Sequence, residues 1–250
     1  MIKLTQGQAE LKADSMIKVI GFDLDDTLWD VIPVIRKAEE KLSRWVLSKF
    51  PGIRYGVSEI ERARKKILLE NPALGFQFTR IRKAILREIF ETHLKDPLIA
   101  DKLSQEGVEV FIKARSQVEL FPGVERTLEI LAKQYNLGVI TNGNADINQM
   151  EISKYFSFSI SAEQVGVPKP GPEIFLAALR QTKVDSNEFL YVGDDMVNDI
   201  DGAKNVGMAT VWKKNLFSKP NGSTVPDGII DQIDTLPEAI KEIASRRSLR

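Results

Sequence analysis

Residues 17–28 form the sequence IKVIGFDLDDTL, in which a short apolar run leads into three carboxylates and a hydroxyl. The apolar run predicts a buried strand that delivers Asp23, Asp25, Asp26 and Thr27 at its carboxyl end. Carboxylates crowded there repel one another and lose hydration, which costs stability unless a cation, a proton or a reaction requires them. The stretch therefore predicts a functional site.

Taken alone, this stretch allows two interpretations. Short polar side chains satisfy free backbone N–H groups, so Asp25, Asp26 and Thr27 could form a turn and a helix cap. Alternatively, Asp23 is a nucleophile, Asp25 is its acid/base partner and a divalent cation lies between them. The second interpretation requires further chemical groups downstream, so the rest of the chain decides between the two.

The composition is ordinary for a globular protein. The 250 residues, 28% charged and 43% hydrophobic, can form one α/β domain and a smaller module. Without cysteine the chain has no disulfide, thiolate nucleophile or zinc-thiolate site, and no apolar run approaches the roughly 20 residues of a membrane span. We expect a cytoplasmic protein that does not enter a membrane, with residues 1–15 as an N-terminal extension and His93 in a structural role.

Charge is unevenly distributed along the chain. Residues 31–118 contain 18 Lys and Arg against 11 Asp and Glu, and the remainder has the opposite imbalance. A basic module beside an acidic one suits an anionic small molecule. Nucleic acid is not an expected partner, because the basic residues are spread over predicted helices and do not form one stripe with aromatic side chains.

Periodicity divides the chain into two kinds of structure. Residues 31–118 have helical spacing, with apolar stripes at Ile32, Ile35, Leu42, Trp45 and Val46 and at Ile81, Ile85, Ile89 and Phe90, and glycine and proline divide them into about four helices. Beyond residue 119, predicted strands at 137–141, 158–161, 189–192, 209–212 and 228–230 alternate with helices at 124–134, 146–154, 172–181, 198–206 and 237–244. This alternation predicts a parallel, Rossmann-like α/β sheet with helices on both faces. Residues 16–30 and 119–250 would form that core, and 31–118 an inserted helical bundle.

Polar residues follow the predicted strands where the crevice of such a sheet lies. Thr141, Asn142 and Gly143 follow one strand and can offer O–H and N–H donors to a phosphate, although an N-cap would also explain them. Lys169 stands between two prolines, which would fix the direction of its ammonium. Another strand ends in a run that carries more carboxylates than a helix cap needs, at Asp194, Asp195 and Asp199.

Taken in order, Asp23-x-Asp25-x-Thr27, Thr141, Lys169-Pro170 and Gly193-Asp194-x4-Asp199 resemble the four motifs of the haloacid dehalogenase-like phosphatases. The resemblance extends from residue 19 to about residue 212, and the helical insertion looks like the C1 cap of that family. It implies that Asp23 attacks phosphorus to form an aspartyl-phosphate and that Asp25 is the general acid and base.

The same resemblance assigns the binding residues. Thr141, Lys169 and the backbone of Asn142 and Gly143 would hold the phosphoryl oxygens of a small phosphorylated metabolite. Hard oxygen donors favour Mg²⁺, and the ligands would be the carboxylates of Asp23 and Asp194 and the backbone carbonyl of Asp25. Asp195 and Asp199 would orient water and Lys169 from behind these ligands.

Several other functions remain open. Dehalogenases of this superfamily lack the second aspartate, which is present here as Asp25. Phosphomutases have both aspartates and a helical cap, receiver domains are about half this length without the insertion, and a non-catalytic protein could bind a phosphorylated ligand in the same cradle. Sequence around the motifs is most similar to phosphatases of flavin mononucleotide and riboflavin-pathway phosphates, with nucleotide and sugar phosphates as further substrates. We expect specificity contacts from four residues of the insertion, Phe76, Phe78, Arg80 and Arg82.

Overall fold

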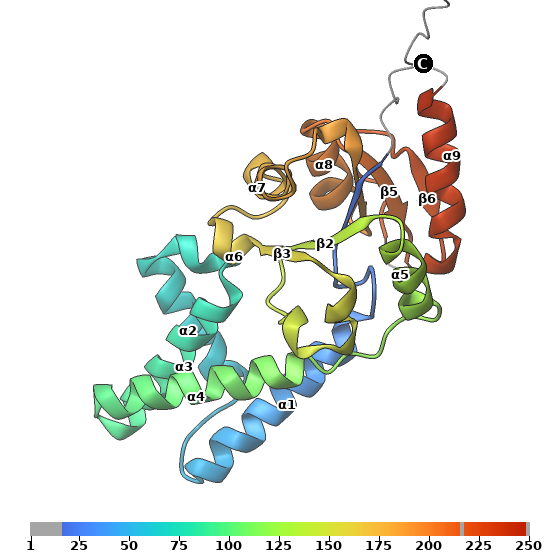
Figure 1. Cartoon of the computed structure of the whole chain (residues 1–250). Coiled ribbons are helices and arrows are strands. Elements are labelled where there is room, and N and C mark those ends of the chain that lie inside the picture. Colours follow the sequence, from blue (N-terminus) through green and yellow to red (C-terminus); the bar gives the residue numbers. More distant parts are fainter. Residues whose placement is uncertain (1–16, 216–217, 249–250) are drawn as a thin grey trace, which may run out of the picture.

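A six-stranded parallel sheet forms the centre of the computed structural model, which describes residues 17–215 and 218–248 (Figure 1). The predicted extension at residues 1–15 lies outside the described residues. The strands are β1 Val19–Phe22, β2 Asn136–Thr141, β3 Phe158–Ser161, β4 Phe189–Gly193, β5 Ala209–Lys213 and β6 Gly228–Ile230. They lie in the order β3-β2-β1-β4-β5-β6 and pair in parallel throughout, which confirms the predicted α/β fold.

Alternation along the strands explains the two layers of helices. One apolar cluster contains Ile20 and Phe22 of β1 and Leu190 and Val192 of β4. The residues that alternate with them along the strands, Val19, Phe189 and Tyr191, belong to another cluster. The first cluster includes side chains of α5 (Val124–Ala132) and α9 (Leu236–Ser248), and the second those of α7 (Pro172–Thr182) and α8 (Gly202–Asn205). Because side chains alternate between the faces of a strand, each strand anchors both layers. A single turn, α6 (Ala162–Val165), follows β3.

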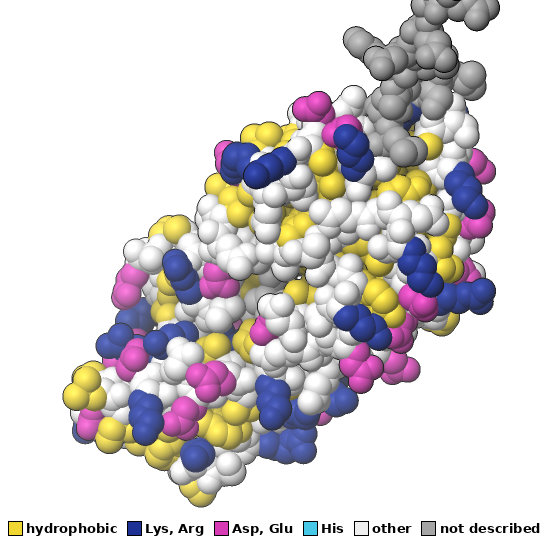
Figure 2. All heavy atoms as spheres, in the orientation of Figure 1, with side chains coloured by type: hydrophobic (Ala, Val, Ile, Leu, Met, Phe, Trp, Pro, Cys, Tyr) yellow, Lys and Arg dark blue, Asp and Glu magenta, His cyan; other side chains and the backbone are white. Residues whose placement is uncertain are grey.

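Four helices form a bundle between β1 and β2, as expected for this part of the sequence. They are α1 Val31–Lys49, α2 Val57–Glu70, α3 Phe78–Leu94 and α4 Pro97–Arg115, with a 3₁₀ turn, η1, at Pro72–Phe76. They have their own apolar core and lie to one side of the sheet (Figure 1). On the face shown in Figure 2, basic side chains of this bundle are interspersed with acidic and apolar ones.

Three local predictions were wrong. Residues 146–154 do not form an α-helix but two 3₁₀ turns, η2 Ile147–Gln149 and η3 Glu151–Tyr155, because Met150 between them is extended. The predicted helix at 198–206 begins earlier as a π-helical segment, η5 Met196–Asp201, before α8. Ile32 is 52% exposed, and the buried stripe of α1 instead contains Val34, Ala38, Leu42 and Val46.

The remaining 3₁₀ turns are short connections, η4 at Ser186–Glu188 before β4 and η6 at Ile233–Thr235 before α9. His93 is held by backbone groups, since its Nδ1 lies 2.8 Å from the Ile89 carbonyl oxygen and its Nε2 accepts from the Arg54 N–H. Within residues 17–215 and 218–248, no helix combines the length and apolar composition of a membrane span.

Candidate active site

The carboxyl ends of three adjacent strands bring together residues that are far apart in the sequence. Asp23 follows β1, Thr141 ends β2 and Asp194 follows β4, and β1 lies between the other two strands. β1 is also the point from which successive strands run outward in opposite directions, where crevices form in open α/β sheets. The sheet topology therefore places these three motifs at one site, as the sequence predicted.

Lys169 reaches this site from the loop after β3 and is buried there. Its Nζ donates to Asp23 Oδ1 and Asp199 Oδ1, both at 2.6 Å, and to the Tyr191 hydroxyl at 2.9 Å. The Tyr191 hydroxyl donates in turn to the Ile140 carbonyl oxygen at 2.6 Å. All three ammonium protons thus have partners, and this fixes the direction of the Lys169 side chain.

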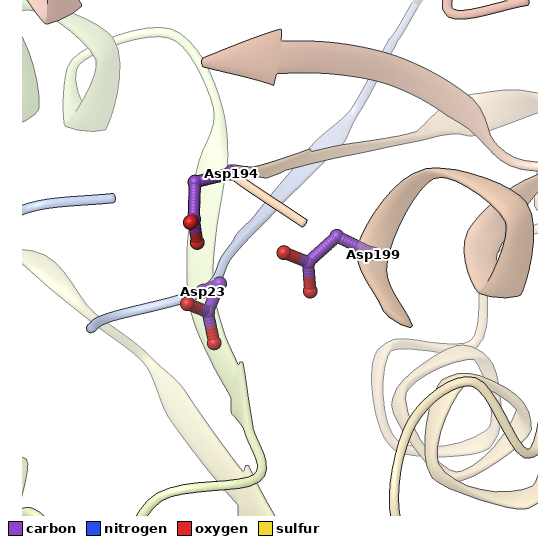
Figure 3. A group of neighbouring side chains, drawn as sticks. All are labelled: Asp23, Asp194 and Asp199. Carbon is purple, nitrogen blue, oxygen red and sulfur yellow. The ribbon is translucent and has the colours of Figure 1, made fainter. Parts of the chain in front are cut away.

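Asp23, Asp194 and Asp199 converge on one small volume (Figure 3). One carboxylate oxygen from each lies within 4.8 Å of the others. The buried Thr27 hydroxyl lies 3.3 Å from Asp194 Oδ1 and 3.5 Å from Asp23 Oδ2. Three carboxylates and the single Lys169 ammonium leave two negative charges when all are ionised, which a divalent cation would neutralise.

The protonation of this cluster reflects its burial. Desolvation raises the pKa of Asp23 to about 7, although the Lys169 ammonium favours the ionised form. Desolvation, followed by the charge of Asp23, raises the pKa of Asp194 to about 8. Burial acts against the charge of Lys169, but Asp199 and Asp23 outweigh it and hold the pKa of Lys169 well above its ordinary value. The negative charge of the cluster can therefore be neutralised either by protons or by a cation.

The donor chemistry of the cluster fits Mg²⁺. It consists of carboxylate oxygens with a hydroxyl nearby, and hard cations prefer such ligands to nitrogen or sulfur. Both oxygens of Asp199 are already engaged, with Lys169 Nζ at 2.6 Å and the Asp195 N–H at 3.0 Å. Asp23 and Asp194 each accept one short hydrogen bond, Asp23 Oδ1 from Lys169 Nζ at 2.6 Å and Asp194 Oδ2 from Asn215 Nδ2 at 2.9 Å. Their other oxygens, Asp23 Oδ2 and Asp194 Oδ1, have only the longer contacts with Thr27, so these two oxygens are the more available ligands.

Asp25 is held apart from that cluster by two side chains. Arg115 Nη2 donates to it at 2.5 Å, and Trp29 Nε1 donates to Asp25 Oδ1 at 2.9 Å. Gly143 leaves room for this carboxylate, because a Cβ there would lie 2.7 Å from Asp25 Oδ2. A carboxyl group placed in this way can exchange a proton with a group bound beside Asp23.

The side chains of Thr141 and Asn142, at the end of β2, stabilise the loops around the site. Asn142 Oδ1 accepts from the Lys169 N–H at 2.7 Å and its Nδ2 donates to the Lys169 carbonyl oxygen at 3.0 Å, which anchors the loop that carries the lysine. The Thr141 hydroxyl oxygen accepts from the Gly143 N–H at 2.9 Å and shapes the turn. The Asn142 side chain therefore stabilises the site by holding the Lys169 backbone.

Other aspartates of the motifs cap local structure. The Asp195 carboxylate accepts from the Val197 and Asn198 N–H groups, so in this structure it caps η5 and does not reach Lys169. Asp26 has a left-handed backbone with φ of 59° and accepts from the Val31 N–H. The cap interpretation, which covered Asp25, Asp26 and Thr27, thus applies to Asp26. The Asp25 carboxylate instead accepts from Arg115 and Trp29, and the Thr27 hydroxyl lies beside Asp23 and Asp194.

Tyr191 and Arg115 are among the residues of the site that were missed from the sequence. Tyr191 reads as an ordinary apolar strand residue, and only the alternation of β4 shows that it faces α7. Arg115 is the last residue of α4, one basic residue among many in the insertion, and nothing in its neighbourhood predicts a buried ion pair with Asp25. Both contacts depend on how distant elements pack together.

The fold and these strand-end motifs define a class of phosphate-handling α/β enzymes, and comparison with known proteins specifies the family. The haloacid dehalogenase-like hydrolase family model matches residues 17–207, so the chain belongs to this family of enzymes. It is 32% identical over 200 residues to 5-amino-6-(5-phospho-D-ribitylamino)uracil phosphatase YigB of Escherichia coli (strain K12), covering 78% of this chain and 83% of the relative. It is 36% identical over 207 residues to the glyceraldehyde 3-phosphate phosphatase of Pyrococcus abyssi, covering 80% and 82%.

Among solved structures, one of a 2-haloacid dehalogenase from Pseudomonas syringae pv. Tomato DC3000 has a TM-score of 0.86 and 40% identity. It covers 91% of this chain and 99% of its own. A phosphatase of this family from Thermococcus onnurineus has a TM-score of 0.55 and 27% identity, with coverage of 89% and 97%. The family that the sequence motifs resemble is therefore confirmed.

Proposed function

We propose that the protein hydrolyses a small phosphomonoester in two steps, through an aspartyl-phosphate on Asp23 and with Mg²⁺ as cofactor. The observation that carries the proposal is the Asp23 carboxylate held 2.6 Å from the buried Lys169 ammonium, next to Asp194. Relatives named as phosphatases of small phosphorylated metabolites support the same class of reaction.

The chemistry divides between the two aspartates of the first motif. A carboxylate oxygen of Asp23 attacks phosphorus while the bond from phosphorus to the ester oxygen breaks, and Asp25 gives its proton to the departing alkoxide. Asp25 then takes a proton from the water that attacks the phosphorus of the intermediate, which releases inorganic phosphate and restores Asp23. The contacts of Arg115 and Trp29 would keep Asp25 in position for both transfers.

The remaining residues would bind the phosphoryl group and the cation. Lys169, the Thr141 hydroxyl and the backbone N–H groups of Asn142 and Gly143 would hold phosphoryl oxygens, for which the Gly143 N–H would exchange its contact with Thr141 Oγ1. Asp23, Asp194 and the Asp25 carbonyl would hold Mg²⁺, and Asp199 would keep Lys169 directed at the phosphate. The cation would supply positive charge that stabilises the transferring phosphoryl group.

We further propose that the bundle at residues 31–118 is the cap of this enzyme and excludes water from the site. Its substrate would be a small phosphorylated metabolite, with neither a membrane nor a nucleic acid as partner, and its location the cytoplasm. Phosphates of flavins and riboflavin precursors, nucleotides and sugars are the substrates to examine, because fold and chemistry alone do not determine the leaving group.

The nucleophile can be tested with Asp23→Asn. We expect this variant to lose at least about 1,000-fold in phosphate release from p-nitrophenyl phosphate with Mg²⁺, because an amide oxygen is a poor nucleophile. Asp30→Asn is the matched control, since Asp30 caps α1 through the Ile32 N–H and asparagine caps equally well. Substantial hydrolysis by folded Asp23→Asn would remove Asp23 from this role.

Dehalogenation is the second candidate, because the similar Pseudomonas syringae structure is titled a 2-haloacid dehalogenase. The two activities can be separated by measuring halide release from 2-chloropropionate beside phosphate release from p-nitrophenyl phosphate. We expect phosphate release and no halide release, because Asp25 is present and would serve as the acid for an alkoxide leaving group. The reverse result would reassign the chain to dehalogenation.

A further inference from the structure

A cavity of about 350 Å³ lies within the helical bundle and extends to Asp25. α1 lines it through residues spaced four apart, Val31, Ile35 and Glu39, and α4 through Phe111 and Arg115. Gly143 and Asn144 complete the lining from the loop after β2. Because Asp25 would protonate the departing oxygen, the group attached to that oxygen must lie on this side of the phosphate.

Most of the cavity wall is apolar. The aliphatic and aromatic side chains include Ile35, Phe78, Ile81, Ile85 and Phe111. The volume is within the range of about 300–1,000 Å³ that is typical of small-molecule pockets. A leaving group of two or three carbons would leave much of this wall uncovered, and a polyol alone would place its hydroxyls against hydrocarbon.

Arg82 provides a polar contact inside this wall. Its guanidinium stacks on Phe111, 3.4 Å from the ring centre, and pairs with Glu39 at 2.8 Å. Its Nε is buried and has no hydrogen-bond partner in the described part of the chain. A buried N–H without a partner is costly, and a carbonyl oxygen of a bound molecule would satisfy it.

The charges around the cavity also favour a ligand with hydrogen-bond acceptors. Arg64, Arg82 and Arg115 line the cavity together with the carboxylates of Asp25 and Glu39, which leaves one net positive charge. Arg115 also has two buried nitrogens, Nε and Nη1, without partners among the described residues. The lining therefore favours hydrogen-bond acceptors and disfavours a cationic amine.

We infer that the bundle cavity selects phosphomonoesters whose leaving group carries a planar, largely apolar ring with carbonyl acceptors, and that Arg82 is the residue that recognises the acceptor. The inference rests on the proposed phosphatase function, because it concerns the leaving group of that reaction. Phe111 and the isoleucines would cover the ring, while the Arg82 Nε–H would donate to its carbonyl oxygen.

The first experiment compares substrates for the wild-type protein with Mg²⁺. Flavin mononucleotide and uridine 5′-monophosphate carry a ring with carbonyl groups, whereas glyceraldehyde 3-phosphate and 2-phosphoglycolate do not. Acetyl phosphate, with a very small leaving group, reports on the chemical step. We expect kcat/KM for at least one ring-bearing substrate to exceed that for both small metabolites by about tenfold or more.

The second experiment changes Arg82. Arg82→Met and Arg82→Lys should each lower kcat/KM for the ring-bearing substrate about 10- to 100-fold, as expected when a buried contact to a substrate is lost. Lysine can keep the ion pair with Glu39 but has no N–H at the position of Nε, so it guards against a loss that reflects misfolding. Arg87→Met is the matched control on the same helix, because Arg87 is exposed and pairs with Glu91.

The outcomes separate the inference from the function on which it rests. A larger loss for the ring-bearing substrate than for acetyl phosphate, in both Arg82 variants, supports the inference. Preference for glyceraldehyde 3-phosphate or 2-phosphoglycolate, or equal losses for all substrates, overturns it while the phosphatase function stands. Absence of any Asp23-dependent phosphate release would overturn both.

Discussion

The Asp25 carboxylate is positioned by two side chains, one far away in the sequence and one close by. Arg115, only 1% exposed, forms an ion pair with it across 90 residues, and the Trp29 indole donates from four residues further on. A carboxylate fixed by one donor can still rotate about that contact, whereas two donors from different directions restrict the rotation. Arg115 is therefore a positioning residue for the proposed proton transfers.

We expect Arg115→Met to lower kcat for p-nitrophenyl phosphate about 10- to 100-fold with a smaller effect on KM. The reason is that methionine fills similar space but no longer holds the acid and base of the reaction. Arg115→Lys should recover part of the loss, because lysine keeps one charged donor. Steady-state kinetics, with thermal melting to verify folding, measures both, and a folded Met variant with wild-type kcat would contradict the assignment.

The motifs predicted most of the site at this scale because each contains its own chemistry. Asp23, Lys169 and Asp194 meet as expected, since parallel strands deliver their ends to one edge of the sheet. The sequence could not reveal that Asn142 anchors the Lys169 backbone or that Asp195 is used as a cap. Those contacts depend on loop geometry, which residue type and spacing do not determine.

Among the elements, strands and long helices followed the sequence pattern better than short helices. Buried strands have a clear apolar run, and the stripe of α3 at Ile81, Ile85 and Ile89 is buried as expected. The segment from 146 to 154 also has helical residues, but Met150 adopts an extended conformation there. Over so few residues a tertiary constraint outweighs helix propensity, because short helices have little stability of their own.

α3 is capped by a residue outside the bundle. It has no side-chain cap of its own, and the carboxylate of Glu163 accepts from the N–H groups of Arg80 at 3.0 Å and Thr79 at 3.4 Å. Glu163 belongs to α6, which follows β3, so this contact connects the bundle to the sheet. A negative charge at a helix N-terminus is favourable both as a cap and toward the helix dipole.

We expect Glu163→Ala to lower Tm by about 2–4 °C, which corresponds to a loss of about 1 kcal/mol in a protein of this size. Hydrogen exchange should become faster at Thr79 and Arg80 while the centre of α4 stays protected. Glu163→Gln, which retains an acceptor, should fall between the alanine variant and the wild type. Unchanged exchange in the first turn of α3 of the alanine variant would show that Glu163 does not cap this helix.

At the scale of the whole molecule, the bundle and the sheet bring opposite charge to one site. The sheet supplies the acidic cluster at Asp23, Asp194 and Asp199, and the bundle supplies Arg82 and Arg115, which line the cavity that extends to Asp25. Such an arrangement can hold an anionic phosphate between a cation and the leaving-group cavity. A cation at the proposed site would link the stability of the molecule to its activity, and this link would depend on pH.

Burial raises the pKa of Asp23 to about 7 and that of Asp194 to about 8, whereas both would be near 3.8 in an unfolded chain. With no cation bound, the contribution of these groups to stability is present at low pH and is lost as pH rises from about 4 through 8. Mg²⁺ bound to these carboxylates would require their ionised forms, so its binding would release protons at any pH below about 8. The increase in Tm caused by Mg²⁺ should consequently be larger at pH 8.5 than at pH 6.

Thermal melting with and without Mg²⁺ across this pH range measures the effect, and calorimetry in buffers of different ionisation enthalpy counts the protons released. For each proton released, the apparent Kd for Mg²⁺ should fall by up to about tenfold as the pH rises by one unit. Asp194→Asn should reduce the dependence, because it removes one proposed ligand together with its titration and leaves only that of Asp23. A Tm increase of equal size at pH 6 and pH 8.5 in the wild type would place the cation away from Asp23 and Asp194.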